Sequence, residues 1–219
     1  MIAKEITTTD LLPLRPDDNC AQAMTMMSIY HVSDLPVVEN NELLGIISED
    51  QVSSTDLDTK ISSFRLSQSY IFVTVDEHIF EILGKMAQNN MTIMPVVNHD
   101  NKYVGMITQE DLIKFYADTF SFKEPGSIIV IQSTKSEYSL SEITRVLEME
   151  GASILASFVT SMTNSPNILV TLKLNRLEIS KLLSSLERYD YRIHATFSED
   201  QYESDLKSRY DLLMTYLNV

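Results

Sequence analysis

Two short segments place a hydroxyl group and polar side chains where a helix can begin. They are Thr108-Gln109-Glu110-Asp111 and Ser48-Glu49-Asp50-Gln51. A hydroxyl beside the N–H groups of a helix N-terminus suits an anion, and a carboxylate can accept two hydrogen bonds from a diol. The same spacing also describes a helix capping box, in which the two side chains bond to backbone N–H groups. Both interpretations remain open for Thr108 and Asp111. In the other segment Gln51 stands where Asp111 stands, and Asp50, one residue earlier, should point about 100° away.

These segments end two copies of an internal repeat. Leu35-Pro36-Val37-Val38 recurs as Met94-Pro95-Val96-Val97, and Gly45-Ile46-Ile47-Ser48 recurs as Gly105-Met106-Ile107-Thr108. Each copy predicts helix, strand, polar turn, strand and helix, and Asp17 or Asp76 could cap the first of these helices. One copy is too small to bury both faces of its sheet, so we expect the copies side by side.

The repeated pattern of Pro-Val-Val, a polar turn and Gly-Ile-Ile-Ser or Gly-Met-Ile-Thr resembles the CBS motif, twice, over about residues 1–120. The resemblance implies a pseudo-twofold CBS pair over residues 1–124, with repeats at about 1–59 and 60–124. It also implies that Thr108 holds a ligand phosphate, that Asp111 holds its ribose, and that Met94 and Pro95 line the base pocket. Met94 and Pro95 could equally be core residues.

The implied ligand is an adenosine-containing molecule: AMP, ADP, ATP or S-adenosylmethionine. The first copy implies a weaker site at Ser48 and Pro36, because Gln51 replaces the ribose acceptor. Neither helix-start segment contains Lys or Arg, so a triphosphate has no obvious cationic partner there.

Residues 125–200 predict the order β-α-β-β-α-β, which is ferredoxin-like. The expected strands are 127–132, 152–162, 167–174 and 191–197. The first helix begins with the capping box Ser139 to Glu142, and 175–178 should cap the second. Joined to a CBS pair, this unit looks like an ACT domain, and the whole resembles acetoin-utilisation accessory proteins in architecture. The segment 133–138 lacks the glycine of the ACT ligand loop, so amino-acid binding is not expected.

The last segment, 201–219, predicts an amphipathic C-terminal helix with Tyr202, Leu206, Tyr210, Leu213 and Leu217 on one face. It could dock on its own chain or on a partner subunit. The fold class is therefore α+β: a CBS pair, an ACT-like domain and this helix.

Composition narrows the functional classes. The net charge is −14, most of it in residues 1–124, and an acidic surface disfavours nucleic-acid binding. No apolar run reaches the length of a membrane span, and the single cysteine, Cys20, fits a cytoplasmic protein. His31, His78, His99 and His194 lack metal-ligand spacing, and no nucleophile–base set can be assembled, so we expect neither a metal site nor catalytic residues.

Two functions remain open. The first is a regulatory sensor, in which a nucleotide in the second copy shifts the arrangement of a homodimer. The alternative is a non-catalytic interaction scaffold with degenerate sites. CBS pairs and ACT-like sheets commonly form dimers, and an open sheet edge favours a partner strand. Asp111 favours sensing, whereas Gln51 and the missing glycine favour the scaffold, and the regulated partner protein is not identified by the sequence.

Overall fold

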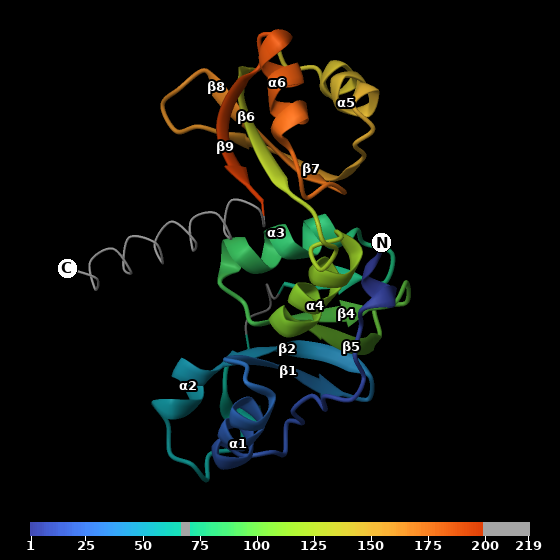
Figure 1. Cartoon of the computed structure of the whole chain (residues 1–219). Helices are drawn as coiled ribbons and strands as arrows, with labels where there is room; N and C mark the ends of the chain where they lie inside the picture. The colour runs from blue at the N-terminus through green and yellow to red at the C-terminus, as the bar shows by residue number, and fades with distance from the viewer. Residues whose placement is uncertain (67–70, 199–219) are drawn as a thin grey trace, which may run out of the picture. The chain divides into compact units, whose positions relative to one another are not determined.

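The computed structural model describes residues 1–66 and 71–198. The chain forms two compact units, Met1–Tyr116 and a second that begins at Ala117 (Figure 1). The sequence placed the boundary between the CBS pair and the next domain after residue 124, and that boundary stays a proposal. The expected C-terminal helix at 201–219 lies outside the described residues.

The first unit contains short helices, long helices and two β-hairpins. In chain order its elements are η1 (Ala3–Glu5), α1 (Cys20–Tyr30), β1 (Asp34–Glu39), β2 (Glu42–Ser48), α2 (Glu49–Ser53), η2 (Ile61–Ser63), β3 (Val73–Thr74), α3 (Ile79–Asn89), β4 (Ile93–Val97), β5 (Tyr103–Thr108) and α4 (Gln109–Thr119). The β1–β2 and β4–β5 hairpins lie next to each other, with α1 and α2 on one side and α3 and α4 on the other (Figure 1).

The two copies of the repeat fold alike, as the sequence predicted. Helices α1 and α3 each have 11 residues and end in a left-handed residue, His31 or Asn90. In the hairpins Val37 pairs with Gly45 and Val96 with Gly105, and each pairing is followed by a β-bulge at the next residue. A repeated bulge at the same position is strong support for a common fold, because bulges are specific features of a strand pair.

The first helix of each copy is not capped by the expected aspartate, Asp17 or Asp76. The N-caps are Asn19, which forms a complete capping box with Gln22, and His78, whose side chain accepts from the Phe80 N–H. Asp17 and Asp76 lie two residues before these caps. At the surface Asp17 instead forms an ion pair with Lys60, and the Asp76 carboxylate lies 3.0 Å from His99 Nε2.

The N-terminal segment crosses to the second copy. Thr8 and Met106 exchange backbone hydrogen bonds of 2.9 and 3.1 Å, and Ala3 is fully buried in the core of the second copy. Farther along, Leu14 lies parallel to Val37 as Val73 lies parallel to Val96. The β4–β5 hairpin thus gains β3 as a third strand, whereas the β1–β2 hairpin gains only a single bridge at Leu14. The crossing of the N-terminal segment ties the two copies together.

The second unit has the predicted β-α-β-β-α-β order. Its elements are β6 (Ile128–Thr134), α5 (Leu140–Met149), β7 (Ile154–Ser161), β8 (Asn167–Leu174), α6 (Ser180–Arg188) and β9 (Arg192–Phe197). All pairs in the sheet are antiparallel, in the order β7-β8-β6-β9. This is the ferredoxin-like arrangement, and its core lies between α5, α6 and one face of the sheet.

The two helices of this unit begin differently. Ser139 caps α5 by accepting the Glu142 N–H, as expected. The expected cap at 175–178 is wrong for Asn175, because the Asn175 side chain accepts the Ser153 N–H at 2.8 Å instead. Helix α6 follows Ile179, which provides no side-chain cap.

Candidate functional site

Thr108 and Asp111 meet where β5 passes into α4. The Asp111 Oδ2 atom accepts hydrogen bonds from the Thr108 N–H at 2.9 Å and from the Thr108 hydroxyl at 2.7 Å. The Asp111 N–H in turn donates to the Thr108 hydroxyl oxygen at 3.0 Å. The pair therefore forms a capping box with an aspartate in place of the usual glutamate.

The cap leaves part of the Asp111 carboxylate available. Within the described part of the chain, its Oδ1 atom accepts no hydrogen bond. The Asp111 side chain is half-buried and Thr108 is 7% exposed. A half-buried carboxylate oxygen beside the N-terminus of an 11-residue helix can accept a hydroxyl hydrogen bond from a ligand.

The corresponding residues of the first copy form a helix cap. Ser48 and Gln51 form the complete box: Gln51 Oε1 accepts the Ser48 N–H at 3.0 Å, and Ser48 Oγ accepts the Gln51 N–H at 3.4 Å. Helix α2 has only five residues, and Asp50 is exposed. The first copy therefore has a neutral amide where the second has a carboxylate.

The register of the β4–β5 hairpin separates the other expected site residues. Ile93 lies opposite Thr108, Met94 opposite Ile107, and Pro95 opposite Met106. Because side chains alternate along a strand, Pro95 shares a face with Thr108, whereas Met94 points to the other face. Met94 is fully buried in the core of the second copy. The structure therefore places Pro95 on the same face of the hairpin as Thr108, whose side chain contacts Asp111. The Met94 side chain lies on the opposite face, in the core.

In the first copy the register is the same. Asp34 lies opposite Ser48, and Pro36 lies opposite Ile46. Pro36 is buried on the face that carries Ser48. The two junctions thus have the same strand register, and they differ chiefly in one side chain, which is Asp111 in the second copy and Gln51 in the first.

The starts of β1 and β4 touch beside the two junctions. The Ser33 N–H donates to the Thr92 hydroxyl at 2.9 Å, and Asp34 accepts from the Thr92 N–H and hydroxyl at 3.1 Å each. The Ser33 and Thr92 carbonyls accept the first N–H groups of α2 and α4, respectively. These bonds link the backbone segments that precede the two junctions.

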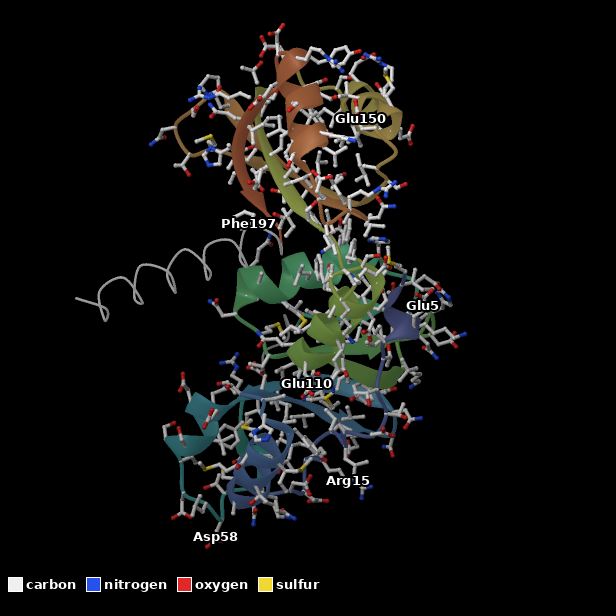
Figure 2. All side chains as sticks on the ribbon, in the orientation of Figure 1. Glu5, Arg15, Asp58, Glu110, Glu150 and Phe197 are labelled. Atoms are coloured by element: carbon white, nitrogen blue, oxygen red, sulfur yellow. The ribbon has the colours of Figure 1, made fainter. Side chains whose placement is uncertain are left out.

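Two cationic or basic groups near the second junction were missed at the sequence level. Lys114 binds Glu110 at 2.6 Å, and this hydrogen bond and charge, with a smaller contribution from His31, lower the pKa of the Glu110 carboxyl. The Lys114 contact is an ordinary i,i+4 pair on a helix and could have been found from spacing. His31 lies 79 residues before Glu110, so only the packing of the two copies places it there. Figure 2 labels Glu110 on α4.

Two cavities lie away from these junctions. One of about 600 Å³ lies in the first copy between the segment before α1 and the β1–β2 turn. Another, of about 500 Å³, lies in the second unit between the ends of β6 and the α6–β9 turn. Neither is lined by Thr108 or Asp111.

The described residues fit neither a metal site nor a membrane span. They contain no group of three or more His, Cys, Asp or Glu side chains that could hold a metal ion. Among residues 1–66 and 71–198, no helix has the length and apolar character needed to span a bilayer.

Two curated relatives are each similar to about half of this chain. The chain is 31% identical over 113 residues to inosine-5'-monophosphate dehydrogenase of Methanocaldococcus jannaschii, a match that covers 51% of this chain and 23% of that enzyme. An uncharacterized protein of the same organism is 25% identical over 53% of this chain and 40% of its own length. The chain thus spans less than half the length of these two relatives.

Solved structures show likeness at lower identity. A CBS domain pair/ACT domain protein from Thermotoga maritima is 18% identical, with a TM-score of 0.48 over 54% of this chain and 98% of that one. CBSX2 in complex with AMP is 17% identical, with a TM-score of 0.46 over 53% of this chain and 96% of that one.

The family model gives the most direct assignment. The CBS domain model matches residues 3–56 and again residues 61–118, which are the two copies of the repeat. These matches together cover half of the sequence. The chain therefore belongs to the CBS-domain family and carries a tandem pair of CBS domains.

Proposed function

We propose that the chain is a non-catalytic regulatory module that senses an adenosine-containing nucleotide, chiefly at the N-terminus of α4 in the second CBS domain. The observation that carries this proposal is the meeting of Thr108 and Asp111, with Asp111 Oδ1 left without a partner in the described part of the chain. In this proposal Thr108 and the first N–H groups of α4 hold the phosphate. Asp111 accepts the ribose hydroxyls.

The surroundings support an anionic ligand with an apolar base. Pro95 lies on the Thr108 face, and Met94 supports that strand from the core. Lys114 supplies a cation near the junction, although Glu110 holds it in an exposed ion pair. A phosphate that displaces Glu110 would gain a charge-assisted hydrogen bond from Lys114. One such cation suits a monophosphate better than a triphosphate.

We propose that the signal passes through the arrangement of a homodimer. In the described part of the second unit, β7 and β9 each pair with only one neighbouring strand. A sheet edge with free N–H and C=O groups favours pairing with another strand, and closed twofold symmetry satisfies such an edge most simply. The Ser33–Thr92–Asp34 contacts offer a route from the second junction to the first.

One observation favours the alternative, an interaction scaffold. Ser48 and Gln51 use both side chains in a complete capping box. The first domain thus has a structural explanation for its polar residues without any ligand. If the Thr108–Asp111 pair is likewise only a cap, both sites are degenerate and the CBS surfaces serve to assemble partners.

A thermal-shift screen distinguishes the two functions. Purified protein is heated with AMP, ADP, ATP or S-adenosylmethionine, each alone and at constant ionic strength. A sensor gives a concentration-dependent rise in the melting temperature, since ligand at 100 times its Kd stabilises by about 2.7 kcal/mol. Absence of any rise up to millimolar concentration, with all four ligands, would favour the scaffold.

A further inference from the structure

The 600 Å³ cavity of the first CBS domain has an acidic and apolar lining. Its walls include Asp18 and Glu39, the apolar side chains of Leu12 and Met26, and Arg15. Asp17 also lines it but is paired with Lys60 at 3.0 Å. With Asp17 neutralised by that pair, the remaining lining charges, Asp18, Glu39 and Arg15, leave a net charge of about −1.

The second CBS domain shows what occupies the corresponding place there. Asp18 accepts the Arg15 N–H at 2.7 Å through Oδ2, and the equivalent Glu77 accepts the Thr74 N–H at 3.4 Å through Oε2. The second oxygen of Glu77, Oε1, binds the ammonium group of Lys85. In the first domain the second oxygen of Asp18, Oδ1, has no hydrogen bond from the described residues.

The difference comes from one helix position. Lys85 occupies in α3 the place that Met26 occupies in α1, since both helices have 11 residues and their caps are equivalent. The second domain thus supplies its own four-carbon ammonium to this carboxylate, with the Lys85 side chain 38% exposed and the Glu77 side chain 20% exposed. The first domain has a thioether there, in the wall of the open cavity.

We propose that this cavity binds a primary alkylammonium group, whose nitrogen reaches Asp18 as Lys85 reaches Glu77. The alkyl chain lies against Met26 and Leu12, and the ammonium donates to Asp18 Oδ1. Asp18 is one methylene shorter than Glu77, so the ligand nitrogen must enter the cavity more deeply than Lys85 does in the second domain. The site is separate from the Thr108–Asp111 junction and does not depend on the nucleotide proposal.

The test uses n-butylammonium chloride, which reproduces the lysine side chain. The full-length protein carries methyl-labelled methionine, and the Met26 signal, identified by its loss in Met26→Leu, is followed by NMR at constant ionic strength. We expect a saturable shift of the Met26 signal that n-butanol does not produce. Asp18→Asn keeps an oxygen for the Arg15 N–H and should weaken binding about tenfold or more. The control Asp58→Asn removes the same charge from a residue that does not line the cavity and should bind as wild type.

Two further variants use the internal comparison. Met26→Lys should fill the site from within and abolish binding, while Lys85→Met should create a second site, reported by the new methionine signal. Equal affinity in wild type and Asp18→Asn, an equal shift with n-butanol, or undiminished binding in Met26→Lys would each overturn the proposal. Parallel titrations with N-acetyl-lysine methylamide and with cadaverine compare a lysine of a polypeptide with a free diamine. The probe that binds more tightly indicates which of the two the cavity prefers.

Discussion

The N-terminal segment crosses to the second copy beside Gly105, so the substitution Gly105→Ala tests this crossing by adding one methyl group. The φ of Gly105 is +155°, and a Cβ added there would lie 2.5 Å from the Thr8 carbonyl oxygen and 2.7 Å from Thr7 Cγ2. Because the nearest atom belongs to the backbone, a side-chain rotation cannot relieve the contact. Gly105→Ala should therefore push the N-terminal segment away from β5.

The expected loss follows from the bonds that this movement breaks. The two Thr8–Met106 backbone hydrogen bonds contribute about 1–3 kcal/mol together. An alanine held at this φ adds about 1–3 kcal/mol of backbone strain. The first unit should thus lose at least about 2 kcal/mol of its free energy of unfolding, and Ala3 should leave its buried place in the core of the second copy.

Native-state hydrogen exchange measures this loss locally, which matters in a two-unit chain that need not unfold in one step. The Thr8 and Met106 amides should exchange faster in Gly105→Ala by a factor of about 30 or more. Gly84→Ala is the matched control, since its added Cβ has no atom within 4 Å in the middle of α3, and it should gain about 0.5–1 kcal/mol. Wild-type protection of both amides in Gly105→Ala would refute the crossing.

Three further predictions concern other parts of the chain. The buried Tyr103 hydroxyl has no partner among the described residues, so Tyr103→Phe should leave the stability at neutral pH unchanged or raise it by up to about 1 kcal/mol in urea titrations. Burial raises the pKa of Tyr103, so the unfolded state releases this proton first, and the stability of the wild-type protein falls as pH rises above the unfolded-state pKa of about 10; an equal fall in Tyr103→Phe between pH 9 and 11 would contradict this. No common amino acid should bind the second unit at micromolar concentration in calorimetry, because the Glu137 N–H already donates to the Thr134 hydroxyl in a loop without glycine. Light scattering should give a homodimer at micromolar concentration, and a mass of 24.9 kDa would show that the homodimer proposal is wrong.

The repeat allowed most of the fold to be predicted from the sequence. Residues 36 and 95 have equivalent places in two hairpins, and the β-α-β-β-α-β order of the second unit is confirmed. These features depend on local patterns of apolar side chains, turns and caps, which a sequence displays directly.

The remaining features depend on contacts between distant residues. Thr8 pairs with Met106, 98 positions later, and no local pattern identifies that partner. Asp17 and Asp76 resembled helix caps, but Asn19 and His78 follow them and lie nearer the first helical residue. Asn175 has a suitable side chain for a cap, yet a nearby N–H of Ser153 uses it.

At the candidate site, the sequence suggested Thr108 and Asp111 as ligand-binding residues but left their geometry open, and their role stays a proposal. In the β4–β5 register Met94 lies opposite Ile107, and both side chains belong to the core of the second copy. The open cavity beside Asp18 required comparison of Met26 with Lys85 in three dimensions. The spacing of the repeat shows that Met26 and Lys85 occupy equivalent positions. Whether the space beside Asp18 is filled by other side chains can be seen only in the three-dimensional structure.

The central claim, nucleotide binding at Asp111, is tested most directly by isothermal titration calorimetry of matched variants. The ligand is the nucleotide that gives the largest thermal shift. Asp111→Asn keeps an oxygen for the Thr108 cap but loses the charged acceptor. The control Gln51→Asn places the same residue at the corresponding position of the first domain, where the side chain is already a neutral amide. We expect one site in the wild-type protein, unchanged affinity in Gln51→Asn, and a loss of about 1.5–3 kcal/mol in Asp111→Asn, which is about tenfold or more. Equal affinity in the wild-type protein and in Asp111→Asn would contradict the account.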